Sequence, residues 1–165
     1  MDTSAFIAGF DPFSIDEDQY TVPKVKEEFA GSPMALARFN AAIESGKLKV
    51  REPSTTFIEK IKTLASLIGD FAFLSETDLQ VLALALQLKM HGYAPIIATD
   101  DYSIQNVAHH LGIEFASLAT FGIRKPLKWV RYCPACHRKY SPDYNSKTCY
   151  VCGTELKRKP LRKTS

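Results

Sequence analysis

Four cysteines close together in the C-terminal part of the chain constrain its fold more than any other feature of the sequence. They form two Cys-x-x-Cys pairs, and twelve residues separate the pairs. The four residues are Cys133, Cys136, Cys149 and Cys152. Each pair can present two thiolates to one ion, and two pairs complete the closed tetrahedral site that is typical of structural zinc. We therefore predict a small zinc ribbon in which the ion stabilises the fold and leaves no position open for a substrate.

Two other interpretations of the cysteines are weaker. A pair of disulfides would be typical of a secreted domain, but no signal peptide precedes the predicted fold and the chain has no further cysteine. Redox Cys-x-x-Cys motifs would need a strand before and a helix after each motif. Because the cysteines are expected to be reduced, and the apolar runs are too short to span a bilayer, we expect a cytoplasmic protein without a membrane partner.

Charge divides the chain into an acidic body and a basic C-terminal segment. Residues 121–165 hold twelve Lys or Arg against two Asp or Glu, a net charge of +10, whereas residues 1–120 hold nine against sixteen, a net charge of −7. Aromatic residues are interleaved with the basic ones, which is typical of nucleic-acid binding, because cations neutralise phosphates and aromatic faces stack on unpaired bases. The candidate RNA-binding residues are Lys125, Lys128, Trp129, Arg131, Arg138 and Lys139. The alternative is a basic surface that only promotes solubility.

Periodicity and capping signals predict an α/β fold. At 165 residues and 45% hydrophobic composition, the chain suits one globular domain with a small metal-stabilised module. Helices are expected at about 33–45, 55–68, 76–91 and 103–111, and short strands at 47–51, 94–98 and 113–115. Helices that alternate with single strands predict a parallel sheet flanked by helices. We assign residues 1–120 to this domain, 121–156 to the linker and zinc ribbon, and 157–165 to a basic, flexible tail.

Several acidic residues follow predicted strands or begin predicted helices. Ligands of parallel sheets bind beyond the carboxyl ends of the strands, so these side chains are expected to converge there. The candidate catalytic carboxylates are Asp2, Glu28, Asp78, Asp100 and Asp101. Clustered carboxylates repel one another unless a cation neutralises them, and Mg²⁺ and Mn²⁺ prefer oxygen ligands. An ion held in this way can activate water and stabilise a phosphodiester during in-line hydrolysis.

Each of these acids also has a purely structural explanation. Ser75 and Asp78 have the spacing of a capping box. Either Asp100 or Asp101 can cap the helix that follows it. The other two acids can simply be solvated, so the spacing of the residues leaves the choice between structural and catalytic roles open.

Four segments, joined to the four-cysteine ribbon, carry a more specific signal. They are Asp2–Ile7, Thr21–Glu28, Gly69–Leu79 and Thr99–Val107. Together they resemble the PIN-domain nucleases and, more closely, the archaeal form of the Nin-one-binding endonuclease family, over nearly the whole chain. The resemblance implies a PIN fold, a divalent-metal site and an endoribonuclease that cuts single-stranded precursor rRNA of the small subunit at its 3′ end. It also implies a pre-ribosomal particle, and a KH-domain assembly factor, as partners.

The same resemblance assigns roles by matched position. It implies that four acids hold Mg²⁺ or Mn²⁺, and that Asp100 is the near competitor of Asp101 for one of these positions. The four are Asp2, Glu28, Asp78 and Asp101. Ser4 and Thr99 are expected to donate hydrogen bonds to the carboxylates. The sequence departs from the family in one respect, because several residues of strand usually precede the first acid and here only Met1 does.

Three alternative functions remain at this point. A toxin-type PIN ribonuclease would share the acids but would normally lack the ribbon. A non-catalytic assembly factor would use the ribbon to bind rRNA and the acids only as structural groups. An aspartyl-phosphate phosphotransferase is the weakest alternative, because it would need a second Asp at the position of Ser4.

Overall fold

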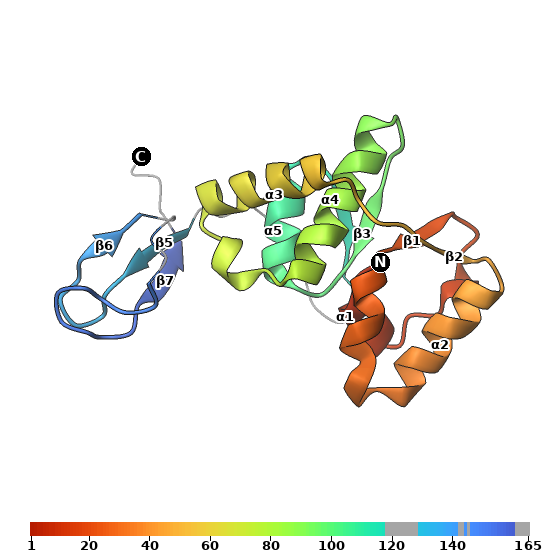
Figure 1. Cartoon of the computed structure of the whole chain (residues 1–165), viewed down its shortest axis with the longest axis horizontal. Helices are drawn as coiled ribbons and strands as arrows, with labels where there is room; N and C mark the ends of the chain where they lie inside the picture. Colours follow the sequence, from red (N-terminus) through yellow and green to blue (C-terminus); the bar gives the residue numbers. More distant parts are fainter. Residues whose placement is uncertain (118–128, 142–143, 145, 161–165) are drawn as a thin grey trace.

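The chain folds into an α/β body and a smaller β module beside the C-terminal end of α3 (Figure 1). The computed structural model describes residues 1–117, 129–141, 144 and 146–160. Its α-helices are α1 (Thr3–Ile7), α2 (Pro33–Glu44), α3 (Thr55–Ile68), α4 (Glu76–Met90) and α5 (Tyr102–His110), and its 3-10 helices are η1 (Pro12–Ser14), η2 (Pro23–Gly31) and η3 (Phe71–Phe73). Its strands are β1 (Gln19–Thr21), β2 (Leu48–Val50), β3 (Ile96–Ala98), β4 (Glu114–Ala116), β5 (Trp129–Tyr132), β6 (Lys139–Tyr140) and β7 (Lys157–Pro160).

The strands of the body pair in parallel, as the alternation of helices and strands predicts. β1 pairs with β2, and β3 pairs with β4. The backbone of the first two residues joins these pairs: the Met1 amine donates to the carbonyl of Tyr20 (2.7 Å), and the Asp2 N–H donates to the carbonyl of Ala98 (3.2 Å). The N-terminal segment therefore occupies the centre of the parallel arrangement. The strand β1 was not predicted, because three residues are too few for a recognisable alternation.

The helices begin and end close to their predicted limits. α3 ends at Gly69, whose φ of +87° is the left-handed conformation that glycine adopts most readily. α4 begins at Ser75 with the expected capping box and is buried over most of its circumference, as its apolar pattern predicts. The segment that carries Glu28 forms the 3-10 helix η2. None of the helices in the described ranges has both the length and the apolarity that a bilayer crossing requires.

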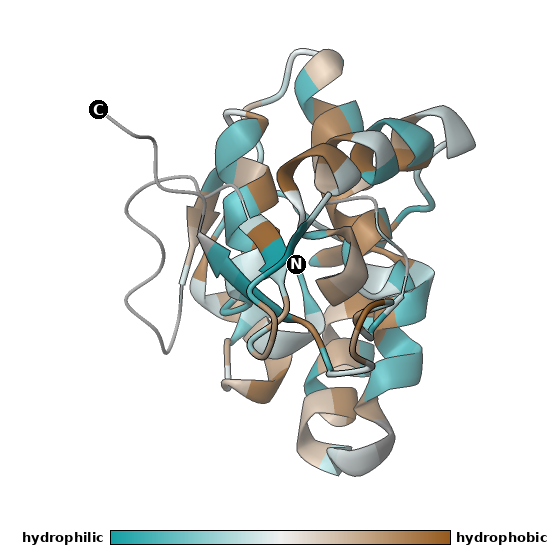
Figure 2. Cartoon of the chain, turned by 90° about the vertical axis from the view of Figure 1, so that its left-hand side faces the viewer, coloured by the Kyte–Doolittle hydropathy of each residue, from teal (hydrophilic) through white to brown (hydrophobic). Residues whose placement is uncertain are grey.

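Three phenylalanine rings fix the arrangement of α1, η2 and α2. The ring of Phe6 meets those of Phe29 and Phe39 edge-on, with centroid separations of 5.6 and 5.5 Å, and the latter two rings are 5.2 Å apart. All three side chains are buried. Figure 2 shows apolar and polar stretches alternating along the helices of the chain, as expected where one face of a helix packs on the core. Phe29 is adjacent to Glu28 in the sequence, so this packing positions Glu28 relative to the start of α1.

The C-terminal module is a three-stranded antiparallel sheet in the order β6-β5-β7. β5 pairs with both of its neighbours, and residues 157–160 form the full length of β7. These four residues were expected in the flexible tail. They are instead part of the sheet, because the backbone groups of β5 that face away from β6 need hydrogen-bond partners. The linker residues 118–128 and the end of the tail, 161–165, lie outside the described ranges.

Candidate active site and metal centre

Asp2 lies at the centre of a hydrogen-bond network between the two parallel strand pairs. Its carboxylate accepts from the N–H of Thr3 (2.7 Å) and from the hydroxyls of Ser4 (2.7 Å) and Thr99 (2.8 Å). The side chain is buried, and Asp2 is the N-cap of α1. The two hydroxyl donors that the sequence indicated are therefore the groups that hold this carboxylate. The short N-terminal segment still brings Asp2 to the carboxyl end of β3.

The neighbouring aspartates after β3 point their carboxylates to different partners. Asp101 is the N-cap of α5: its Oδ1 accepts from the N–H of Ser103 (2.6 Å), and its own N–H donates to the Thr99 hydroxyl (3.1 Å). Asp100 accepts a hydrogen bond from the hydroxyl of Ser117 (2.6 Å), just beyond β4. Thr99 thus links the backbone of Asp101 to the Asp2 carboxylate, and Ser4 links the backbone of Asp100 to it in the same way, since the Asp100 N–H donates to the Ser4 hydroxyl (3.1 Å).

Asp78 lies in the first turn of α4, and its environment disfavours the ionised form. Its Oδ2 accepts from the N–H of Ser75 (2.7 Å), and its N–H donates to the Ser75 hydroxyl (3.1 Å). The pKa of Asp78 is raised to about 6, mainly by burial; the negative charges of Asp2 and Asp101 contribute to the rise, and the Ser75 hydrogen bonds oppose it. Like charges act on one another in this way only when they are near, so Asp2, Asp78 and Asp101 share one electrostatic site.

Glu28 reaches the same region from η2. Its Oε2 accepts from the hydroxyl of Thr3 (2.6 Å), the residue that follows Asp2, and its side chain is exposed. No three carboxylates in the described ranges bring their ligand oxygens within 4.8 Å of one another. Among the described residues, the acids therefore do not form a closed cluster.

Glu28, Asp78 and Asp101 each use one oxygen for the fold, whereas Asp2 uses both. In the part of the chain that the structure describes, no hydrogen bond reaches Oδ1 of Asp78, Oδ2 of Asp101 or Oε1 of Glu28. Asp2 Oδ1 accepts a single hydrogen bond and retains a lone pair. Oxygen donors with uncompensated negative charge fit a hard divalent cation such as Mg²⁺ or Mn²⁺.

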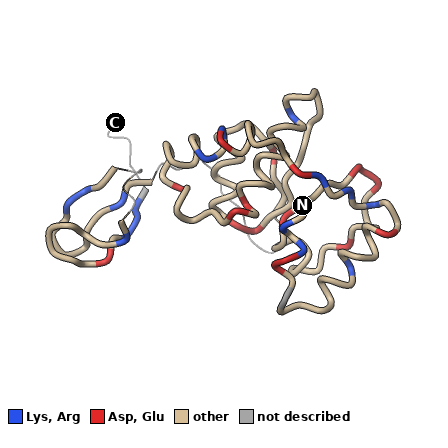
Figure 3. The backbone as a smooth tube through the Cα atoms, viewed as in Figure 1, with Lys and Arg blue, Asp and Glu red and all other residues tan. Residues whose placement is uncertain are grey.

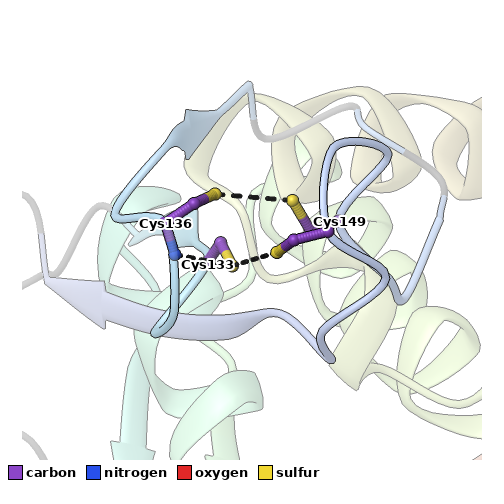
Figure 4. A group of neighbouring side chains, drawn as sticks. Cys133, Cys136 and Cys149 are labelled. Atoms are coloured by element: carbon purple, nitrogen blue, oxygen red, sulfur yellow. Dashed lines mark hydrogen bonds between the residues drawn. The ribbon is translucent and has the colours of Figure 1, made fainter.

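The four cysteines meet in the C-terminal module with the geometry of a tetrahedral thiolate site. Their sulfur atoms all lie within 4.8 Å of one another. The labelled cysteines of Figure 4 point toward a common centre. The closest pairs, Cys133–Cys152 at 3.4 Å and Cys136–Cys149 at 3.6 Å, are too far apart for disulfide bonds. The donor set and its spacing fit zinc.

The two Cys-x-x-Cys turns have the same backbone structure. The N–H of His137 donates to the carbonyl of Cys133 (2.9 Å), and the N–H of Gly153 donates to the carbonyl of Cys149 (2.8 Å). His137 and Gly153 both have positive φ, +58° and +71°. Each turn therefore presents its two sulfurs to the same side.

Tyr140 supports the cysteines from within the module. Its hydroxyl donates to Cys149 Sγ (2.8 Å), and the ring is buried. Burial by itself would raise the pKa of Cys149. The hydrogen bond from Tyr140 and those from the N–H groups of Cys152 and Val151 outweigh burial and lower this pKa to about 6. Tyr140 thus favours the thiolate, which is the form that binds metal. The sequence marked Tyr140 only as one of several aromatic residues, because this contact depends on the packing of β6 against the second turn.

The described RNA-binding candidates fall into two groups. Arg138 and Lys139 are exposed, and the Arg138 guanidinium contacts the exposed Tyr150, with a hydrogen bond of 2.6 Å to its hydroxyl. Trp129 and Arg131 are half-buried and make contacts within the protein: Arg131 donates to the carbonyl of Tyr144 (2.8 Å). The other two candidates, Lys125 and Lys128, lie outside the described residues. Figure 3 shows that Lys and Arg predominate in the β module, whereas most Asp and Glu residues lie in the body.

Comparison with known proteins identifies the family of this chain. The profile of a family described as "PIN domain of ribonuclease" matches residues 1–88. Endoribonuclease Nob1 of Methanocaldococcus jannaschii is 37% identical over 98% of this chain and 77% of its own length. Endoribonuclease Nob1 of Pyrococcus abyssi is 38% identical over 100% of this chain and 95% of its own. The 20S-pre-rRNA D-site endonuclease NOB1 of Saccharomyces cerevisiae is 41% identical over 43% of this chain and 15% of its own.

The body therefore has the fold of the PIN-domain ribonucleases. Within them, the chain belongs to the Nob1 endoribonuclease family, since its similarity to the archaeal proteins extends through the four-cysteine module.

Replacing Asp78 with Asn is expected to stabilise the protein at neutral pH. The pKa of Asp78 is about 6 in the folded protein and has its ordinary value of 3.8 in the unfolded chain. Between pH 3.8 and about 6, the folded protein therefore keeps a proton on Asp78 that the unfolded chain has lost. Stability should therefore fall as the pH rises through this window, by about 1 kcal/mol once the partial exposure of the group is allowed for. Asn keeps an oxygen that accepts from Ser75.

Urea unfolding of both proteins at pH 4.5 and 7, without Mg²⁺ or Mn²⁺, measures this difference. Glu76→Gln is the matched control, because Glu76 lies on the same turn, is exposed and pairs only with Lys24. A wild-type protein that loses no stability relative to Asp78→Asn would contradict the shared electrostatic site.

Replacing Tyr140 with Phe is expected to weaken zinc binding by about tenfold, because hydrogen bonds to metal ligands commonly contribute this much. Tyr144→Phe is the control, since the Tyr144 hydroxyl donates to the carbonyl of Thr148 and not to a sulfur. Competition with a chromogenic chelator measures both affinities. Equal affinities in the two variants would show that the Tyr140 hydroxyl does not stabilise the thiolate.

Proposed function

We propose that this protein is a divalent-metal-dependent endoribonuclease that cleaves precursor small-subunit rRNA at its 3′ end. The observation that carries the proposal is the network in which Thr99 joins Asp2 to Asp101 and Ser4 joins Asp2 to Asp100, with Asp78 close enough to share their electrostatic field. The membership of the Nob1 family supports the reaction and the class of substrate. We expect the reaction to take place on a pre-ribosomal particle in the cytoplasm, with a KH-domain assembly factor as a possible neighbour.

In this proposal, Asp2, Glu28, Asp78 and Asp101 hold one or two Mg²⁺ or Mn²⁺ ions. A bound ion would lower the pKa of a water molecule and neutralise charge on the scissile phosphate. Ser4 and Thr99 orient the Asp2 carboxylate by donating to it, and the N–H groups of Thr3 and Ser103 fix Asp2 and Asp101 in their rotamers. Among the described residues near the acids we assign no side chain as a nucleophile, so water is the attacking group.

The zinc ribbon would supply affinity for the RNA. An acidic site repels a polyanion, and a basic module beside it offsets this repulsion. The exposed residues Arg138 and Lys139 can contact phosphates, and the exposed ring of Tyr150 beside Arg138 offers a face on which a base can stack. We therefore centre the proposed RNA-binding surface of the ribbon on these three residues.

Replacing Asp101 with Asn should reduce cleavage by about 100-fold or more while leaving α5 intact, because Asn is a good helix cap but lacks the charge that holds a cation. The measurement is cleavage of an RNA that spans the 3′ end of small-subunit rRNA, with Mn²⁺, with Mg²⁺ or with neither ion. Asp100→Asn is the matched control and should retain cleavage within a few-fold. If Asp100→Asn is the inactive variant instead, the assignment of the two neighbours is reversed; if both variants cut as well as wild type, the acidic site is not catalytic.

Replacing Arg138 and Lys139 together with Gln should weaken RNA binding and reduce its dependence on salt. Two lost phosphate contacts should lower the slope of log K against log salt by about 1.4 for a single-stranded RNA. Fluorescence anisotropy over a range of salt concentrations measures this slope, and Lys60→Gln with Lys62→Gln on α3 is the charge-matched control. An unchanged slope in the ribbon variant would mean that the RNA binds elsewhere.

A further inference from the structure

One arginine of the zinc ribbon is inserted into a contact with the body. Arg158, in β7, donates to Asp70 Oδ1 (2.9 Å) in the turn between α3 and η3. Its guanidinium carbon lies 3.7 Å from the ring centroid of Phe73, in the body, and 4.3 Å from that of Trp129, in the ribbon. A planar guanidinium can stack on both rings while it donates to a carboxylate in its own plane. The contact thus depends on the planar guanidinium of arginine, which lysine lacks.

The carboxylate at the centre of this contact requires its partners. The Asp70 side chain has no exposed surface. Its Oδ2 accepts from Asn106 Nδ2 in α5 (2.5 Å). Burial raises the pKa of Asp70, and the hydrogen bonds and charge from Asn106 and Arg158 oppose that rise. A buried charge that loses its partner is strongly destabilised, so the body favours the state in which the ribbon supplies Arg158.

A backbone contact next to Asp70 adds to the junction. A β-carbon on Gly69 would lie 2.7 Å from the carbonyl oxygen of Trp129 and 3.1 Å from its Cβ. Contacts under 3.0 Å do not occur between such atoms, so the first strand of the ribbon packs directly on the end of α3. Figure 1 shows the ribbon beside this end of the helix. Two independent contacts, one polar and one steric, therefore join the modules.

This junction is connected to two of the proposed catalytic acids. The turn that carries Asp70 and Phe73 leads directly to Ser75, whose capping box holds Asp78. Asn106 belongs to α5, which begins at its cap Asp101. The ribbon is therefore docked beside the loop and the helix that carry these acids, so this junction sets its position relative to them.

We propose that Arg158, Asp70, Asn106, Phe73 and Trp129 form a latch that holds the zinc ribbon as a rigid arm. Arg158 is then a positioning residue: it fixes the distance between RNA bound on the ribbon and the carboxylates of the body, and so determines which phosphodiester is cut. The statement about RNA rests on the proposed function, whereas the rigidity of the arm does not.

The rigidity is tested by ¹⁵N relaxation of the zinc-loaded full chain, which gives a rotational correlation time for each module. The variants are Arg158→Gln and the double variant Asp70→Asn with Arg158→Gln, which leaves no unpaired carboxylate and so guards against loss of the fold. Lys157→Gln is the control, because it removes the same charge from an exposed position of β7. Both modules should tumble together in wild type and in Lys157→Gln, and the ribbon should tumble faster than the body in the two latch variants.

The positioning role is tested by mapping cuts in two RNAs. One spans the 3′ end of small-subunit rRNA, and the other is too short to contact both modules. On the long RNA, the latch variants should spread their cuts over several positions and lose about tenfold in kcat, because small displacements of a reacting group are costly. On the short RNA they should match wild type, as should Lys157→Gln on both substrates.

The outcomes separate the two levels of the proposal. Independent tumbling of the ribbon in wild type, or joint tumbling in the double variant, overturns the latch. A single sharp cut by the double variant on the long RNA overturns the positioning role. A wild-type protein that cuts neither RNA contradicts the proposed function, and the correlation times then decide the latch by themselves.

Discussion

The hydrogen bonds of Asp2 connect the two halves of the body. Its N–H donates to β3, its carboxylate accepts from Thr99 at the end of β3, and the preceding Met1 bonds to β1. Since β1 pairs only with β2, and β3 only with β4, among the described strands, this short segment is the central element that gives the acidic site its geometry. Thr99 extends the same network to Asp101, and Ser4 extends it to the backbone of Asp100. A change at Asp2 would therefore disturb the strand arrangement and the site together.

Structural and catalytic roles are combined in the same carboxylates. Asp2 and Asp101 cap α1 and α5, and Asp78 completes the capping box of α4. The N-terminus of a helix favours negative charge, so three helix starts directed at one region can hold three carboxylates without a metal ion. The pKa of Asp78 is raised mainly by burial, and the charges of Asp2 and Asp101 add to this rise. The capping explanation of these acids thus does not exclude the proposed catalytic one, because the cap of Asp78 and that of Asp101 each use only one carboxylate oxygen.

The opposite charges of the two modules give each a separate part in the proposed reaction. The acidic body can hold cations but repels RNA, and the basic ribbon attracts RNA but offers only a closed thiolate site. Their combination is useful only if their separation is controlled. In the proposed latch, the Arg158–Asp70 contact provides that control, where the last strand of the ribbon meets the turn after α3. One basic residue of the ribbon is therefore committed to the fold, while Arg138 and Lys139 remain exposed.

The sequence by itself determined the four-cysteine module and the helices, because these depend on spacing and local periodicity. Cys-x-x-Cys turns, the Ser75–Asp78 capping box and the glycine stop at Gly69 are short-range features that any packing must accommodate. The spacing of the acids left their roles open, and only the resemblance to a family assigned them. Only the tertiary structure decided what those residues contact: β1 and β7 were missed because short strands are stabilised by partners distant in the sequence, and the hydrogen bonds of Asp101 to Thr99 and of Asp100 to Ser117 had no local signal. Asp70 and Arg158, 88 positions apart, gave no local signal at all, since a buried ion pair is defined by the surfaces that exclude water from it.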